Sequence, residues 1–222
     1  MTKICVSVMV EGPERVLETM TRAKDMGANL LEWRLDVTRE PEVESVLRRA
    51  PLPVIATVRS VDHGGHFSGS REEQLQLLLR AAAGGSSYLD WEFRRGEDLP
   101  DELASMRERL ILSHHNFRET PPDNKLEALF NEMVATKAGV VKVVTLAQAM
   151  EDNLSLLSLI GLGRKQGAKV VAFCLGSLGR ISRVACLLIG GAFTYAALES
   201  GAEAAPGQLT LPELQQLLDL LQ

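Results

Sequence analysis

Residues 139–176, GVVKVVTLAQAMEDNLSLLSLIGLGRKQGAKVVAFCLG, contain a complete strand–helix–strand pattern. Two short runs rich in valine, 139–146 and 169–176, predict buried strands. Between them, apolar residues recur three and four positions apart over 153–167, which predicts a helix. Strands that alternate with helices in this way are typical of a parallel sheet in an α/β fold.

The same alternation runs through the whole chain. The predicted strands are 3–10, 29–36, 52–60, 88–93, 110–117, 139–146, 169–176 and 192–198. Each is followed by a predicted helix, over 13–27, 42–50, 70–85, 101–110, 125–138, 153–167, 179–190 and 210–221. Eight such units in 222 residues match the size of a closed (β/α)8 TIM barrel. We therefore expect one catalytic domain over 1–222.

The main alternative is an open, doubly wound sheet. Such a sheet normally carries a glycine-rich phosphate-binding turn after an early strand. The first turn here is MVEGPE (9–14), which is not GxGxxG, and the motif GxxxxGK[ST] is absent from the sequence. The count of strand–helix units therefore favours the barrel.

Composition excludes several classes of function. The net charge of −5 argues against general binding to nucleic acid or to an anionic membrane. No apolar run approaches the length of a membrane span, and the first residues do not resemble a signal peptide. The three cysteines lack the spacing of a disulfide framework or a zinc site, so we expect small core residues in a reducing cytoplasm.

Charged and polar residues stand at the same end of successive predicted strands. Residues two apart share one face of a strand, and the C-terminal strand ends of a barrel form the active-site face. The residues that meet both conditions are Glu32, Arg34, Asp36, Thr57, Arg59, Asp90, Glu92, Ser113, His115 and Lys142. Taken alone, each of these residues could form an ion pair, cap a helix or lie on the surface. Together they predict a polar pocket for an anionic, hydroxylated substrate, because burying many charges for stability alone is costly.

Lys142 is the most informative of these residues, because it interrupts an otherwise apolar strand at its centre. Desolvation disfavours the ammonium form of a buried lysine, and Arg34, Arg59 and Arg183 would act in the same direction if they lie close. A neutral amine is a nucleophile toward carbonyl groups and forms a Schiff base.

A structural role for Lys142 is equally open from the strand alone, since the lysine could pair with Glu32 or Asp36 across the barrel. His115 on the neighbouring strand favours chemistry, because imine reactions need a proton carrier beside the activated carbon.

An ordered set of motifs resembles a known family over essentially the whole chain. The motifs are KICVSV (3–8), EWRLD (32–36), TVRS (57–60) followed by paired glycines, LSHHNF (112–117) followed by TPP, GVVKVV (139–144), GRISR (179–183) and APGQ (205–208). In this order they resemble the type I 3-dehydroquinases. The resemblance implies a dimeric (β/α)8 barrel without metal or cofactor. It also implies a shikimate-pathway reaction, in which 3-dehydroquinate loses water through a lysine imine to give 3-dehydroshikimate.

The resemblance also implies a role for individual residues. Lys142 corresponds to the imine-forming lysine, His115 to the catalytic histidine that acts as base and then acid, and Arg183 to the arginine that binds the substrate carboxylate. The residues implied to contact substrate hydroxyls or to shape the pocket are Ser7, Glu32, Arg34, Arg59 and Gln208.

One departure from the family pattern concerns the catalytic histidine. The family carries a glutamate before the paired glycines, and this chain reads RSVDHGG (59–65), with His63 at that place. A carboxylate there would raise the pKa of His115, whereas a neutral imidazole adds no charge. We therefore expect His63 to tune His115 differently, with Asp62 or Glu92 as candidates to compensate.

Two further departures are Ala204, where the family often has serine, and Asn116, where aspartate is common. These departures change single positions of the motifs.

Two other functions are alternatives to the dehydratase. A Schiff-base aldolase acting on a phosphorylated sugar would need a phosphate site, for which GSLGR (176–180) is a candidate. A degenerate barrel would bind a pathway metabolite without turning it over.

Overall fold

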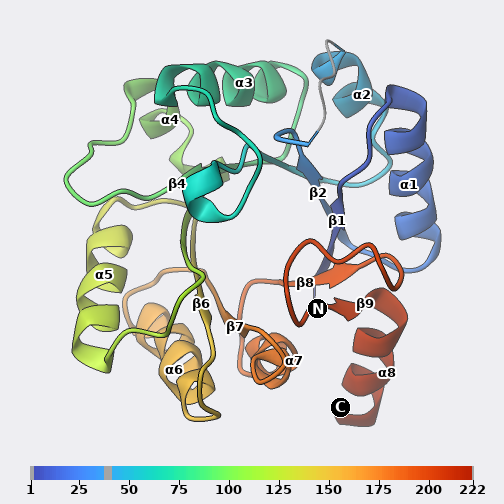
Figure 1. Ribbon diagram of the computed structural model, residues 1–222. Helices are drawn as coiled ribbons and strands as arrows, with labels where there is room; N and C mark the ends of the chain where they lie inside the picture. The colour runs from blue at the N-terminus through green and yellow to red at the C-terminus, as the bar shows by residue number, and fades with distance from the viewer. Residues whose placement is uncertain (1–2, 38–41, 222) are drawn as a thin grey trace.

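The computed structural model describes residues 3–37 and 42–221. Figure 1 shows the strands gathered at the centre of the molecule, with the longer helices around them. The strands are β1 (Ile4–Val8), β2 (Leu30–Arg34), β3 (Val54–Thr57), β4 (Tyr88–Glu92), β5 (Leu110–Asn116), β6 (Val140–Leu146), β7 (Val170–Leu175), β8 (Thr194–Ala197) and β9 (Leu209–Thr210). The helices are α1 (Pro13–Asp25), α2 (Val43–Arg49), α3 (Arg71–Ala83), α4 (Asp101–Ala104), α5 (Asp123–Ala135), α6 (Asp152–Lys165), α7 (Arg180–Leu188) and α8 (Leu211–Leu221), with 3-10 turns η1 (Val61–His63) and η2 (Arg107–Arg109).

The sheet is curled, and all its neighbouring strands are parallel. From β7 back to β1 each strand pairs with its predecessor in the chain, and β1 then pairs with β8. The strand order has no switch point, which a doubly wound sheet requires. The prediction of an α/β barrel is therefore confirmed.

The ring closes between β7 and β8 with the help of a segment that the sequence pattern did not predict. Near the start of these strands, the Ala192 N–H donates to the Val170 carbonyl at 2.8 Å. Toward their ends, the short strand β9 pairs with β8, and the Gly176 N–H donates to the Pro206 carbonyl at 3.0 Å. The loop before β9 therefore completes the barrel wall at its C-terminal end.

One predicted helix is mostly wrong. Residues 101–110 form only the short helix α4 and the turn η2 instead of one continuous helix. The Ser105 hydroxyl donates to the Glu102 carbonyl at 2.6 Å, and the Arg107 guanidinium donates to the Ala104 carbonyl at 3.2 Å. These bonds compete with continued helical pairing, and they end the helix.

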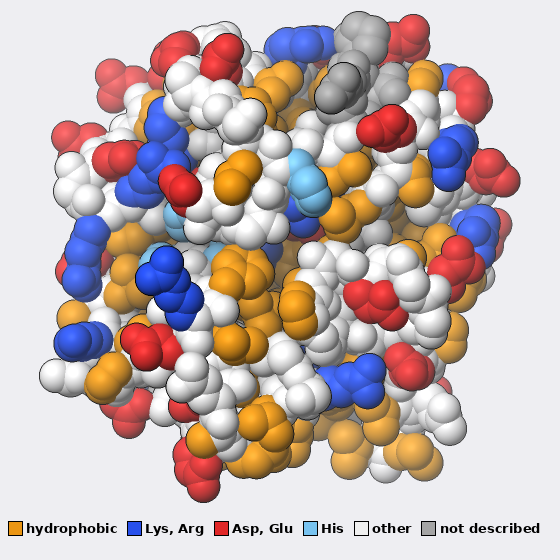
Figure 2. All heavy atoms as spheres, in the orientation of Figure 1, with side chains coloured by type: hydrophobic (Ala, Val, Ile, Leu, Met, Phe, Trp, Pro, Cys, Tyr) orange, Lys and Arg blue, Asp and Glu red, His pale blue; other side chains and the backbone are white. Residues whose placement is uncertain are grey.

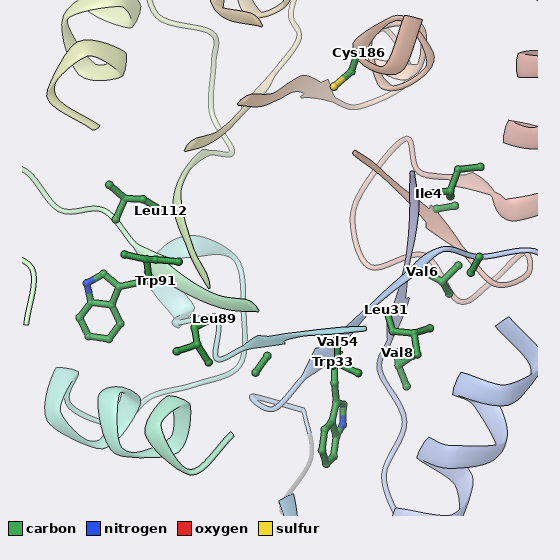
Figure 3. Packing of buried hydrophobic residues seen from close by; sticks show 14 of the residues in the cluster. Ile4, Val6, Val8, Leu31, Trp33, Val54, Leu89, Trp91, Leu112 and Cys186 are labelled. Carbon is green, nitrogen blue, oxygen red and sulfur yellow. The ribbon is translucent and has the colours of Figure 1, made fainter. Parts of the chain in front are cut away.

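Alternation along the strands separates two apolar clusters. The outward-facing side chains pack against the helices, and Figure 3 shows Leu31, Trp33 and Trp91 among them, directed away from the barrel centre. The inner cluster includes Leu30, Ile55, Ile111 and Val140, each two residues before an inward-facing polar residue. A polar tier thus lies directly above an apolar tier inside the barrel.

Local geometry agrees with the predicted helix ends and with the expected state of the cysteines. Ser70 forms a capping box with Glu73 at the start of α3, and Gly27 and Gly167 adopt positive φ just after helices end. Cys5, Cys174 and Cys186 are free and buried. Within the described ranges, the helices are too short or too polar to cross a membrane.

Candidate active site

A small cavity opens at the C-terminal ends of the strands. Figure 2 shows this end of the barrel with a hollow near its centre and histidine side chains beside it. The residues with a predicted site role all line this cavity: Ser7, Glu32, Arg34, Arg59, His63, His115, Lys142, Arg183 and Gln208. The fold therefore brings the predicted set together, and the role of each residue stays a prediction.

Lys142 projects inward from the middle of β6 and is only 4% exposed. Its Nζ donates to the Tyr195 hydroxyl at 3.0 Å and to Asp90 Oδ2 at 3.3 Å. Glu32 Oε1 lies 3.8 Å away. Of the two pairing partners suggested from the strand pattern, Glu32 is therefore present beside the amine.

Asp36, the other suggested partner, pairs with Arg34 instead. Two hydrogen bonds of 2.7 and 2.6 Å join the guanidinium to the carboxylate. Burial alone would raise the pKa of Asp36, but the ion pair with Arg34 holds it below its usual value. Arg34 is thus compensated, and the nearest charged groups around Lys142 are carboxylates. A neutral Lys142 stays a prediction.

Arg59 lies at the centre of a buried network of ion pairs and hydrogen bonds beside the cavity. Its guanidinium lies 2.8 Å from Asp90 and 3.3 Å from Glu92, and it donates to the Ser113 hydroxyl at 2.9 Å. Burial would raise the pKa of Asp90, yet Arg59 and Lys142 lower it below its ordinary value. Asp90 therefore remains ionised and links Arg59 to Lys142.

His115 stands at the end of β5 with its ring stacked on Phe117, the ring centres 6.0 Å apart. Burial, followed by the charges of Arg59 and Lys142, lowers the pKa of His115 well below its usual value. Within the described residues its Nδ1 is buried without a hydrogen-bond partner. The imidazole is therefore neutral near pH 7 and able to accept a proton.

His63, in the turn η1, lies edge-on to His115 with 6.3 Å between ring centres. In the described part of the chain, its Nδ1 has no hydrogen-bond partner either. Burial is the main reason that the pKa of His63 is lowered. His63 is therefore a neutral neighbour of His115. Asp62 and Glu92, the two residues expected to compensate for the missing glutamate, have other partners. Glu92 accepts a hydrogen bond from Ser60, and Asp62 is exposed beside Arg94.

Arg183 enters the cavity from the first turn of α7 and is 1% exposed. Its guanidinium lies 4.5 Å from the Phe173 ring centre and donates to the Pro206 carbonyl at 3.3 Å. No carboxylate of the described residues forms an ion pair with it, and its Nε is buried without a partner. Burial lowers the pKa of Arg183 to about 10, so the group is still a cation near neutral pH.

The loop before β9 delivers Gln208 to the same cavity, where its Oε1 accepts from the Ala204 N–H at 2.6 Å. Gly207 in this loop has φ of +77°, and a Cβ there would lie 2.1 Å from the Gly176 carbonyl. The close approach of these two backbones requires glycine.

The GSLGR segment offers little support for a phosphate site. The N–H of Gly176 is bonded to Pro206, and the N–H of Gly179 to Gly176 at 3.1 Å. A phosphate nest needs unpaired backbone N–H groups that converge on one point.

Among the described residues, no arrangement of three or more His, Cys, Asp or Glu side chains could hold a metal ion.

Among the polar side chains that line the cavity, Tyr195 is the one that the sequence did not predict. It lies on β8 among small residues, and its hydroxyl contacts Lys142. Its side chain packs in the inner apolar cluster with Phe193, and an aromatic residue in a predicted strand indicates packing more often than a site. Only its distance to Lys142 distinguishes the two.

Comparisons with known proteins agree with this geometry. The family model for type I 3-dehydroquinase matches residues 4–222. The 3-dehydroquinate dehydratase of Syntrophobacter fumaroxidans is 36% identical to this chain, over 98% of this chain and 96% of that protein.

Solved structures show the same relationship. The 3-dehydroquinate dehydratase of Geobacillus kaustophilus superposes with a TM-score of 0.87 at 26% identity, over 100% of this chain and 91% of that one. The type I enzyme of Clostridium difficile, solved with covalent modified comenic acid, gives a TM-score of 0.87 at 28% identity, over 99% and 92%. On the evidence of its sequence, fold and cavity, this chain belongs to the type I 3-dehydroquinase family.

Proposed function

We propose that this protein is a 3-dehydroquinate dehydratase of the shikimate pathway, a hydro-lyase that works through an imine on Lys142. The observation that carries the proposal is the buried Lys142 amine in a cavity that also holds a neutral His115 and an unpaired Arg183. These three groups supply a nucleophile, a base and a carboxylate anchor.

Arg183 is the anchor for the substrate carboxylate. Burial of a guanidinium without an acid partner is unfavourable in free energy, and a bound carboxylate would offset this through charge-assisted hydrogen bonds. The remaining polar groups of the cavity then face the ring hydroxyls of the substrate. They are Ser7, Glu32, Arg34, Arg59 and Gln208.

The reaction follows from this placement. The Lys142 Nζ adds to the C3 ketone, and loss of one water gives a protonated imine that draws electrons from C2. His115 removes the C2 proton, and the resulting enamine expels the C1 hydroxyl, which leaves as water with the proton from His115. A second water hydrolyses the imine, so the net change is 3-dehydroquinate to 3-dehydroshikimate plus one water.

A steady-state assay with 3-dehydroquinate tests the activity directly. We expect an increase in absorbance from the conjugated enone of the product. A phosphorylated-sugar aldol substrate, assayed in parallel, should give no turnover. Calorimetric binding of 3-dehydroquinate without enone formation would instead favour a binding protein.

Replacing Arg183 by glutamine should raise KM for 3-dehydroquinate by roughly 100-fold, with a smaller change in kcat, because about two charge-assisted hydrogen bonds are lost. Arg180 lies on the same helix but is exposed, so Arg180→Gln is the matched control and should leave KM unchanged. Equal KM values for the two variants would remove Arg183 from carboxylate binding.

Replacing His63 by glutamate should move the acidic limb of the kcat/KM profile to higher pH by about one unit. A carboxylate beside His115 stabilises the imidazolium and raises the low pKa of His115, so the neutral base is lost at a higher pH. His63→Gln adds no charge and should leave the limb in place. If both variants keep the limb of the unaltered enzyme, His63 does not tune His115.

A homodimer and a cytoplasmic location complete the proposal. Both come from membership of the family and from the expectation of a reducing compartment for the three free cysteines.

A further inference from the structure

Tyr195 is packed beside Lys142 in the barrel interior. It is 4% exposed and pairs in register with Cys5 across β1 and β8. Its ring packs against Phe173 and Phe193, with ring centres 6.1 and 5.5 Å away. The position of its hydroxyl is therefore set by packing on two sides.

The charged and titratable groups around the Lys142 amine come from six other strands or their ends. Glu32 and Asp90 are the carboxylates nearest to Nζ, at 3.8 and 3.3 Å. Tyr195 contributes its hydroxyl at 3.0 Å. Cys5 and His115 interact electrostatically with Lys142, and Arg59 acts together with Lys142 on Asp90.

The three nearest groups differ in what they can do for the amine. An ionised carboxylate only accepts hydrogen bonds, so Glu32 and Asp90 serve the ammonium form. A phenol both accepts and donates. Burial, with Glu32, Cys5 and Asp90 acting in the same direction, raises the pKa of Tyr195 well above its usual value, so its proton is retained. In the described part of the chain, its only hydrogen-bond partner is Lys142 Nζ.

We propose that Tyr195 is a positioning residue that holds the Lys142 amine against the barrel wall and donates its O–H to the nitrogen lone pair when the amine is neutral. Glu32 and Asp90 cannot fill that role, because both only accept. The tyrosine thus lets Lys142 lose a proton without leaving a buried lone pair unsatisfied. The inference deepens the proposed function and rests on Lys142 as the reacting amine.

The test measures the reactivity of the Lys142 amine without substrate. Cyanate carbamylates neutral amines, and peptide mass spectrometry gives the rate at Lys142 as a function of pH. In Tyr195→Phe the neutral amine loses its donor while both carboxylates remain. We expect the pH midpoint for Lys142 to rise by about one unit, and the rate at pH 7 to fall roughly tenfold. An unchanged or lower midpoint overturns the proposal.

Tyr88 is the only other tyrosine of the chain, and it lines a cavity at the opposite end of the barrel, far from the contacts of Lys142. Tyr88→Phe is therefore the matched control and should keep the original midpoint. In that background, biosynthetic 3-fluorotyrosine labels Tyr195 alone and makes its hydroxyl a stronger donor. The midpoint should then move to lower pH, which a purely structural role would not produce.

The two proposals fail in different ways. If the unaltered protein gives no borohydride-trapped adduct on Lys142 with 3-dehydroquinate, the proposed function fails, while the cyanate profiles still decide the role of Tyr195. If the adduct forms but Tyr195→Phe and Tyr88→Phe have the same profile, the role of Tyr195 fails alone.

Discussion

Lys142→Ala should lower kcat/KM for 3-dehydroquinate by about 10⁴-fold or more, because loss of the amine removes the covalent route and its electron sink. In the unaltered protein, borohydride with substrate should leave a mass increase on the peptide that contains Lys142. The variant should still fold, since Asp90 keeps Arg59 at 2.8 Å and the Ser113 hydroxyl at 2.6 Å.

Lys142→Met is the companion variant, because methionine fills a similar space without an amine. It separates the loss of the amine from the effect of the cavity that alanine leaves. Circular dichroism and thermal unfolding establish that both variants fold. A trapped adduct on another lysine, such as Lys169, would contradict the assignment. So would a variant that retains more than a small fraction of the original turnover.

His115→Gln should lower kcat by roughly 10³-fold, the usual scale for loss of a general acid–base group. The imine should still form, so borohydride should still trap an adduct on Lys142. His114 is the matched control, because it is the next residue on β5 and faces the other side of the strand. His114→Gln should keep most of the activity, and similar losses in both variants would contradict a specific role for His115.

The two sets of variants separate the steps of the reaction. Under the proposed mechanism, removal of Lys142 should prevent the first bond to substrate, whereas removal of His115 should stop the reaction after the imine has formed. A covalent adduct that accumulates in His115→Gln and is absent from Lys142→Ala would show that Lys142 acts before His115 in the reaction. No other pattern of adducts is compatible with both assigned roles.

The sequence by itself determined the fold class and most of the cavity. Period-two alternation placed Glu32, Arg59, His115 and Lys142 on inward faces, and the count of strand–helix units placed those faces in one barrel. Such patterns are local and depend on backbone geometry that every strand shares. They are therefore readable without knowing which strands meet.

Only the tertiary structure decided which of these groups touch. Asp36 pairs with Arg34, while Lys142 lies against Asp90 and Tyr195, and β9 completes the wall that carries Gln208. Contacts between residues more than fifty positions apart depend on the register and curvature of the whole sheet, which no local pattern encodes. For the same reason the sequence could name His63 as a candidate neighbour of His115, but the 6.3 Å between their rings came only from the structure.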